Sequence, residues 1–167
     1  MSVLLEVRIN YLYETNSHLY RYVSLGGCFD EEFAVDSKRF FEFVTKQKHI
    51  LLVSEMVEAE ILSAPEQVQA VLRTFSREQV EVLAYTEEVE ALSNAYIQAN
   101  VLMKSSMNDA IHVASATKGD ADVIVSWNFR HLVNLVRIRE FNAVNLRVGY
   151  KMIDIRSPKE LIYEENI

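Results

Sequence analysis

The chain has few of the residues that interrupt or cross-link a fold. Its 167 residues include one cysteine, two prolines and four glycines. A single cysteine excludes an intramolecular disulfide and a multi-cysteine metal site, and Cys28, which follows two glycines, is interpreted as a loop residue rather than a catalytic thiol. With so little proline and glycine, no linker or low-complexity segment is visible, so the length predicts one domain spanning residues 1–167.

Long apolar runs are also missing. No uncharged apolar stretch approaches the length of a membrane span, and the first residues have neither the basic start nor the apolar core of a signal peptide. We therefore expect a cytoplasmic protein with no membrane partner.

Positive charge is scarce overall but concentrated locally. The net charge of −7 argues against a broad nucleic-acid-binding surface. Residues 130–156, however, hold six basic and two acidic side chains, a net charge of +4 that leaves −11 for the rest of the chain. An acidic pocket beside a basic segment suits a metal enzyme that acts on a polyanion, while the alternative is that these arginines are only solvated helix surface.

Apolar periodicity predicts an alternation of strands and helices. Strands are expected at residues 4–13, 49–53, 79–85, 122–126 and 152–155. Helices are expected at residues 17–23, 36–47, 54–62, 65–75, 86–102, 105–118 and 129–138, with a short helical piece near Val144 and a tail helix after Pro158. This order predicts an α/β fold around a mainly parallel sheet.

The segment from Ser105 to Leu132 carries the most informative pattern. Asp109 opens a helix of small apolar residues, and a short buried strand then ends in Trp127 and Asn128. In a parallel sheet the loops after the carboxyl ends of the strands face one crevice, where ligands bind. We therefore expect Asn128 to lie in that crevice, close to the start of the helix.

Three carboxylates are predicted to converge there. Glu14 follows the first strand directly, and Glu60 lies near the apolar face of its helix, where a bare carboxylate needs a metal or a buried arginine. Asp109 starts a helix expected to pack beside Glu14. Converging carboxylates repel one another unless a hard divalent cation binds them, so the pattern predicts a Mg²⁺ or Mn²⁺ site. Taken singly, each acid also fits a helix cap or a solvated side chain.

Four motifs in order resemble those of PIN-domain proteins, the family of the VapC-type toxins. They are Glu14-Thr15-Asn16, Ser54 with Glu60, Asn108 to Ala114, and Val125 to Leu132. The resemblance covers nearly the whole chain. It implies a single α/β/α sandwich with a central mainly parallel sheet, and a Mg²⁺- or Mn²⁺-dependent endoribonuclease. Members of the family are commonly homodimers and are commonly restrained by a small antitoxin protein.

Position by position, the resemblance makes Glu14, Glu60, Asp109 and Asn128 the catalytic and metal-binding residues. Two positions depart from the family pattern. The first acid is usually Asp, and Glu14 is one methylene longer; the fourth acid is Asn128 here, which brings no charge and weakens a second metal most. The alternative hypothesis is therefore a PIN-like module that no longer cleaves and that binds RNA or a protein partner.

Other polar and aromatic residues near these motifs have secondary roles in this interpretation. Arg130 and His131 lie just beyond the crevice and are expected to contact phosphate. His112 is interpreted as a structural helix histidine rather than a base, and Trp127 as a packing residue rather than a platform for bases.

Overall fold

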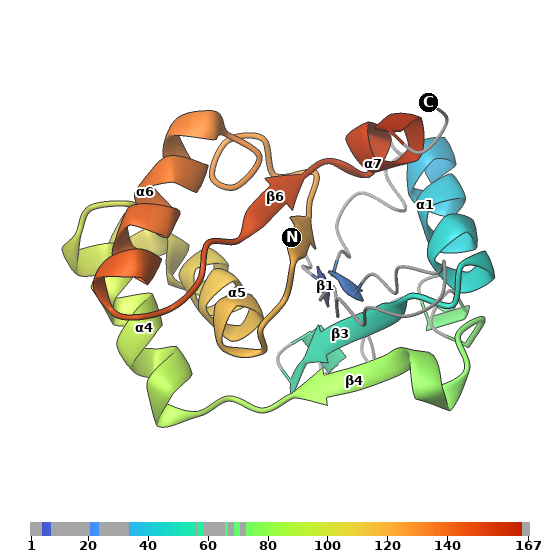
Figure 1. Ribbon diagram of the computed structural model, residues 1–167, viewed down its shortest axis with the longest axis horizontal. Coiled ribbons are helices and arrows are strands. Elements are labelled where there is room, and N and C mark those ends of the chain that lie inside the picture. The colour runs from blue at the N-terminus through green and yellow to red at the C-terminus, as the bar shows by residue number, and fades with distance from the viewer. Residues whose placement is uncertain are drawn as a thin grey trace, which may run out of the picture.

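The computed structural model describes residues 5–7, 21–23, 34–55, 57–58, 66, 69–70 and 73–164. Strands and helices are interspersed along these ranges (Figure 1), which confirms the α/β prediction. The strands are β1 (Leu5–Val7), β2 (Arg21–Val23), β3 (Ile50–Ser54), β4 (Val80–Leu83), β5 (Val123–Val125) and β6 (Asp154–Arg156). The α-helices are α1 (Ala34–Lys46), α4 (Glu87–Gln98), α5 (Met107–Lys118), α6 (Leu135–Arg147) and α7 (Pro158–Glu164). Two short 3₁₀ helices are η1 (Arg77–Gln79) and η2 (Lys104–Ser106).

Most strand pairings are parallel. β4 pairs with β3, β3 with β2, β2 with β5 and β5 with β6, all in parallel. β1 is the exception, because it pairs antiparallel with both β3 and β5. The carboxyl ends of the parallel strands therefore share one edge, and the segment that follows β5 leaves the sheet there.

The helices form two groups. Helices α4, α5 and α6 lie to the left of the strands in Figure 1, and α1 and α7 lie together to the right. Helix α5 packs closely because Ala110, Val113, Ala114 and Ala116 are small and fully buried, as the sequence predicts. None of the helices in the described ranges is long and apolar enough to cross a membrane.

In the turn after α5, Gly119 allows close packing and the next residue, Asp120, takes the left-handed backbone conformation. A Cβ atom on Gly119 would lie 2.7 Å from Cδ1 of Leu83, so the missing side chain lets α5 end against β4. Asp120 takes the left-handed backbone conformation with φ of 61°. Close packing rather than a positive φ accounts for the glycine in this turn.

The predicted start of the helix at residues 129–138 is wrong, and this helix and the helical piece predicted near Val144 belong to one helix. Residues 129–132 form a turn, and one continuous helix, α6, begins at Leu135 after a bend at Val133. Asn134 caps this helix, because its Oδ1 accepts hydrogen bonds from the backbone N–H groups of Val136 and Arg137 at 3.0 and 3.3 Å. The cap places the helix start six residues later than the apolar pattern suggests.

The predicted helix at residues 17–23 is wrong where the structure describes it. Arg21–Val23 form strand β2. A seven-residue helix is marginal, whereas Tyr22 and Val23 have the aromatic and β-branched side chains that favour a strand. Of the strand expected at residues 4–13, Leu5–Val7 is confirmed and the remainder lies outside the described residues.

Candidate functional site

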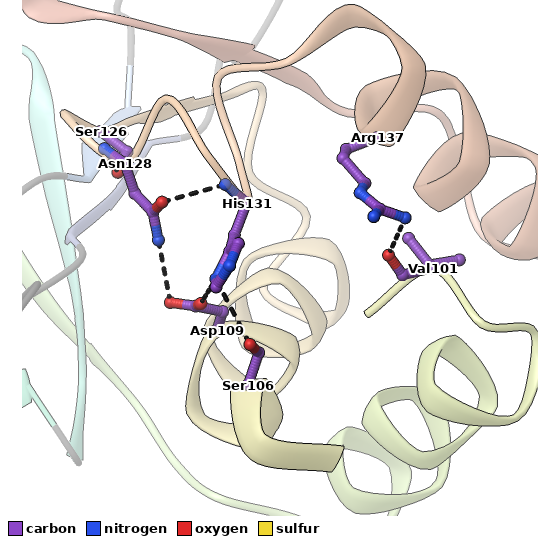
Figure 2. Close-up of polar contacts among 7 residues, drawn as sticks. All are labelled: Val101, Ser106, Asp109, Ser126, Asn128, His131 and Arg137. Carbon is purple, nitrogen blue, oxygen red and sulfur yellow. Dashed lines mark hydrogen bonds and ion pairs between the residues drawn. The ribbon is translucent and has the colours of Figure 1, made fainter. Parts of the chain in front are cut away.

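Asp109 lies in the first turn of α5, at the carboxyl edge of the parallel strands. Its side chain is 16% exposed, and the amino-terminal end of a helix favours a negative charge. Asn128, which follows β5, reaches it from the sheet: Nδ2 of Asn128 donates to Oδ1 of Asp109 at 3.3 Å (Figure 2). The structure thus brings together two of the four predicted site residues.

Hydrogen bonds fix both the backbone and the side chain of Asn128. Its backbone N–H donates to Oγ of Ser126 at 3.0 Å, and its side-chain Oδ1 accepts from the backbone N–H of His131 at 3.0 Å. Because the side-chain oxygen is bonded to the loop, the side-chain nitrogen is left to face Asp109. Asn128 therefore links the end of β5 to the start of α5.

His131 supplies the second contact to the Asp109 carboxylate. Its Nδ1 lies 2.9 Å from Oδ2 of Asp109 and 3.3 Å from Oγ of Ser106 (Figure 2). Because a carboxylate only accepts hydrogen bonds, Nδ1 of His131 carries the proton. The ring is 30% exposed, so part of it faces solvent.

The sequence analysis assigns His131 only to phosphate and does not predict its contact with Asp109. The feature that produces this contact is the tight turn between Asn128 and His131. That turn returns the imidazole to the residue that Asn128 already contacts.

A hard cation fits Asp109 in this arrangement. Each carboxylate oxygen accepts one hydrogen bond and keeps a further lone pair, and such hydrogen bonds commonly orient carboxylates that bind metals. Asn128 fits differently, because its oxygen is engaged by His131 and its nitrogen faces Asp109. As arranged, Asn128 orients Asp109 instead of presenting an oxygen ligand.

The predicted ligands Glu14 and Glu60 lie outside the residues that the structure describes. Among the described residues, no three His, Cys, Asp or Glu side chains gather to hold a metal ion. The convergence of Glu14 and Glu60 with Asp109 therefore stays a prediction.

His112, one turn further along α5, is buried behind the site. It is 2% exposed, and its Nδ1 has no hydrogen-bond partner among the described residues. Burial lowers the pKa of His112 to about 4, and the negative charge of Asp109 only partly opposes this effect. His112 is therefore neutral near pH 7.

The loop after β5 presents two aromatic rings with different surroundings. Trp127 donates from Nε1 to Oγ of the buried Ser37 in α1 at 2.8 Å, so its ring ties the loop to a neighbouring helix. Phe129 is 49% exposed, and Arg130 beside it is also exposed. The first ring packs, as predicted, and the second faces solvent.

The basic segment divides into paired and unpaired cations. Arg137, Lys151 and Arg156 each form ion pairs within residues 120–156. Arg130, Arg139 and Arg147 make no ion pair with any residue in the described part of the chain. These last three side chains can meet an external anion without breaking an internal pair.

Comparison of the chain with protein-family models, with curated proteins and with solved structures finds no match.

Proposed function

We propose that this chain is a divalent-metal-dependent endoribonuclease with a PIN-like α/β/α architecture. The observation that carries the proposal is the arrangement around Asp109. Its carboxylate stands at the start of α5 and is held by Asn128 from the end of a parallel strand, at the edge where α/β proteins bind ligands. The sequence motifs described above supply the expectation that Glu14 and Glu60 join it.

The reaction is hydrolysis of an RNA phosphodiester. A water molecule adds to phosphorus, the bond to one ribose oxygen breaks, and that oxygen leaves with a proton. A Mg²⁺ or Mn²⁺ ion would activate the water and neutralise charge on the phosphate. Asp109, with Glu14 and Glu60, would hold the cation, while Asn128 and His131 keep the Asp109 carboxylate in one orientation.

The charge distribution supports a polyanionic substrate. Arg130, which makes no ion pair with a described residue, follows Asn128 by two residues, and Arg139 and Arg147 lie exposed on α6. The chain is acidic overall, so we expect a phosphate backbone to be attracted mainly to this segment. From the resemblance to PIN-domain proteins, we also propose that the chain forms a homodimer in the cytoplasm. It would act there as the toxin of a type II toxin–antitoxin pair, with a small antitoxin protein as its partner.

A second function is favoured by the same contacts. Both Asp109 oxygens already accept hydrogen bonds, and Asn128 adds no charge at the fourth position. A protein of this kind would bind RNA or a protein partner without cutting. The two functions differ in one measurable property, namely cleavage that depends on a divalent ion.

The test is cleavage of labelled RNA in Mn²⁺ and in EDTA by the wild type, by Asp109→Asn and by a matched control, Glu88→Gln. Glu88 is an exposed acid on α4, paired with Lys118. We expect Mn²⁺-dependent cleavage that falls at least about 100-fold in Asp109→Asn, because even residues that only support metal ligands commonly contribute 10- to 100-fold. Glu88→Gln should cleave like the wild type. RNA binding by the wild type with no cleavage in Mn²⁺ would favour the binding module instead.

A further inference from the structure

The loop that carries Asn128 also holds an aromatic ring at the surface in a fixed position. Phe129 is 49% exposed although it lies one residue from the site. Its backbone N–H donates to the carbonyl of Trp127 at 2.9 Å, and the N–H groups of Leu132 and Val133 donate to the carbonyl of Asn128 at 3.0 and 2.9 Å. The turn is therefore closed by its own backbone hydrogen bonds, which hold the backbone of Phe129 at the surface.

The ring of Trp127 stands beside this exposed ring. The two ring centroids are 6.1 Å apart with planes tilted by 59°. Trp127 is itself fixed by its hydrogen bond to Ser37. Phe129 thus rests beside an anchored neighbour, so little conformational freedom would be lost when another flat ring binds against it.

A cation follows the ring directly. Arg130 is exposed and makes no ion pair with any described residue. Aromatic rings that stack on bases, combined with cations that meet phosphates, are the means by which proteins bind single-stranded nucleic acids. Here the pair sits immediately after the residue that donates to Asp109.

We propose that Phe129 stacks on the nucleobase beside the cleaved bond and that Arg130 pairs with a flanking phosphate. This inference rests on the proposed function and adds a property of the substrate. A base reaches the ring only when it is unpaired, and every base has a π-face, so the site takes single-stranded RNA with little base preference at this position.

The test is a set of fluorescent single-stranded oligoribonucleotides in which one abasic ribose is moved through the sequence. Dissociation constants are measured by anisotropy in EDTA, and cleavage is measured separately in Mn²⁺. Variants are Phe129→Ala, Phe129→Leu, which keeps an apolar side chain without a π-face, and Phe129→Trp. The matched control is Leu146→Ala, since Leu146 on α6 is similarly exposed at 59%.

We expect the abasic ribose at one position to weaken wild-type binding on the order of ten-fold. That position should adjoin the cleaved bond. The penalty should vanish in Phe129→Ala and Phe129→Leu, and persist in Phe129→Trp and Leu146→Ala. Duplex RNA should bind more weakly than the single strand to the wild type.

Several results would overturn the proposal that Phe129 is a stacking platform for a base, called the platform below. They are an equal abasic penalty in wild type and Phe129→Ala, loss of the penalty in Leu146→Ala, or duplex binding as tight as single-strand binding. If the abasic penalty depends on Phe129 but Mn²⁺ produces no cleavage, the platform stands and the endoribonuclease proposal fails. Absence of RNA binding by the wild type would overturn both.

Discussion

The two ends of helix α5 carry polar networks of opposite kinds. At its start, Asp109 accepts hydrogen bonds from Asn128 and His131 in a network that solvent reaches. At its end, Thr117 joins Tyr96 and Asn145, and each of these three residues is 3% exposed or less. Tyr96 donates to Oδ1 of Asn145 at 2.5 Å, and Nδ2 of Asn145 lies 3.3 Å from Oγ1 of Thr117.

The difference separates a structural role from a functional one. The buried network joins α4, α5 and α6, and Tyr96 also packs edge-on against Phe141 with ring centroids 4.9 Å apart. Its groups bond within the protein, so it stabilises the packing of three helices. The network at Asp109 joins a helix to a loop and leaves lone pairs on the carboxylate that no hydrogen bond among the described residues uses. Its carboxylate is partly exposed, unlike the groups of the buried network, which is why we propose the chemistry there.

Replacing the asparagine of each network by aspartate should affect stability very differently, and the buried network should show the larger loss. Asn145→Asp places a carboxylate in a fully buried position, and we expect it to lower the free energy of unfolding by about 3 kcal/mol or more. Mn²⁺ should not restore the loss. The measurement is chemical denaturation in EDTA and in Mn²⁺, with Asn100→Asp as control, since Asn100 lies in an exposed turn that tolerates either residue. A loss below about 1 kcal/mol would contradict the structural role.

His112 lies between the two networks and predicts a dependence of stability on pH. Burial lowers its pKa from 6.5 to about 4 in the folded state, so between these pH values the unfolded chain binds a proton that the folded chain does not. Stability should therefore be complete above pH 6.5 and fall as the pH drops toward 4, by about 1.4 kcal/mol per pH unit for one proton.

Burial also lowers the pKa of His49 to about 4, so this residue should add a similar slope. His112→Leu should lower the number of protons taken up on unfolding by about one and leave the proton contributed by His49. Denaturation between pH 4.5 and 7.5 measures this. An unchanged slope in His112→Leu would show that His112 does not titrate as a buried structural residue.

Asn128→Asp should give the smallest change in stability. The new carboxylate would stand near Oδ1 of Asp109, where Nδ2 now donates at 3.3 Å, and repulsion between the partly buried pair should cost about 1 kcal/mol in EDTA. Mn²⁺ should reverse the loss and raise the melting temperature more than it does for the wild type. Equal responses to Mn²⁺ in Asn128→Asp and Asn145→Asp would remove the distinction between the networks.

Local patterns predicted the elements that build the site. The small residues of α5 and the apolar run of β5 carry strong periodic signals, and the structure places both within one or two residues of the expected bounds. The proximity of Asp109 and Asn128 followed from the rule that loops after parallel strands share one edge. These features depend on neighbouring residues or on general topology, so the sequence alone suffices for them.

The start of α6 and the role of His131 depend on competition between side chains. Apolar spacing favoured a helix from Phe129, but Asn128 accepts the N–H of His131 within a turn, and Asn134 caps the helix that begins at Leu135. The contact from His131 to Asp109 spans 22 residues and follows from that turn. Periodicity contains no information about which of two capping residues prevails.

A calorimetric titration of Mn²⁺ into the wild type, Asp109→Asn and Glu88→Gln tests most directly whether Asp109 belongs to a metal site. We expect the wild type and Glu88→Gln to bind Mn²⁺ and Asp109→Asn to lose most of this binding. If the wild type takes up no Mn²⁺, or if Asp109→Asn binds it equally well, the carboxylate of Asp109 is not the centre of a metal site, and the proposed nuclease fails with it.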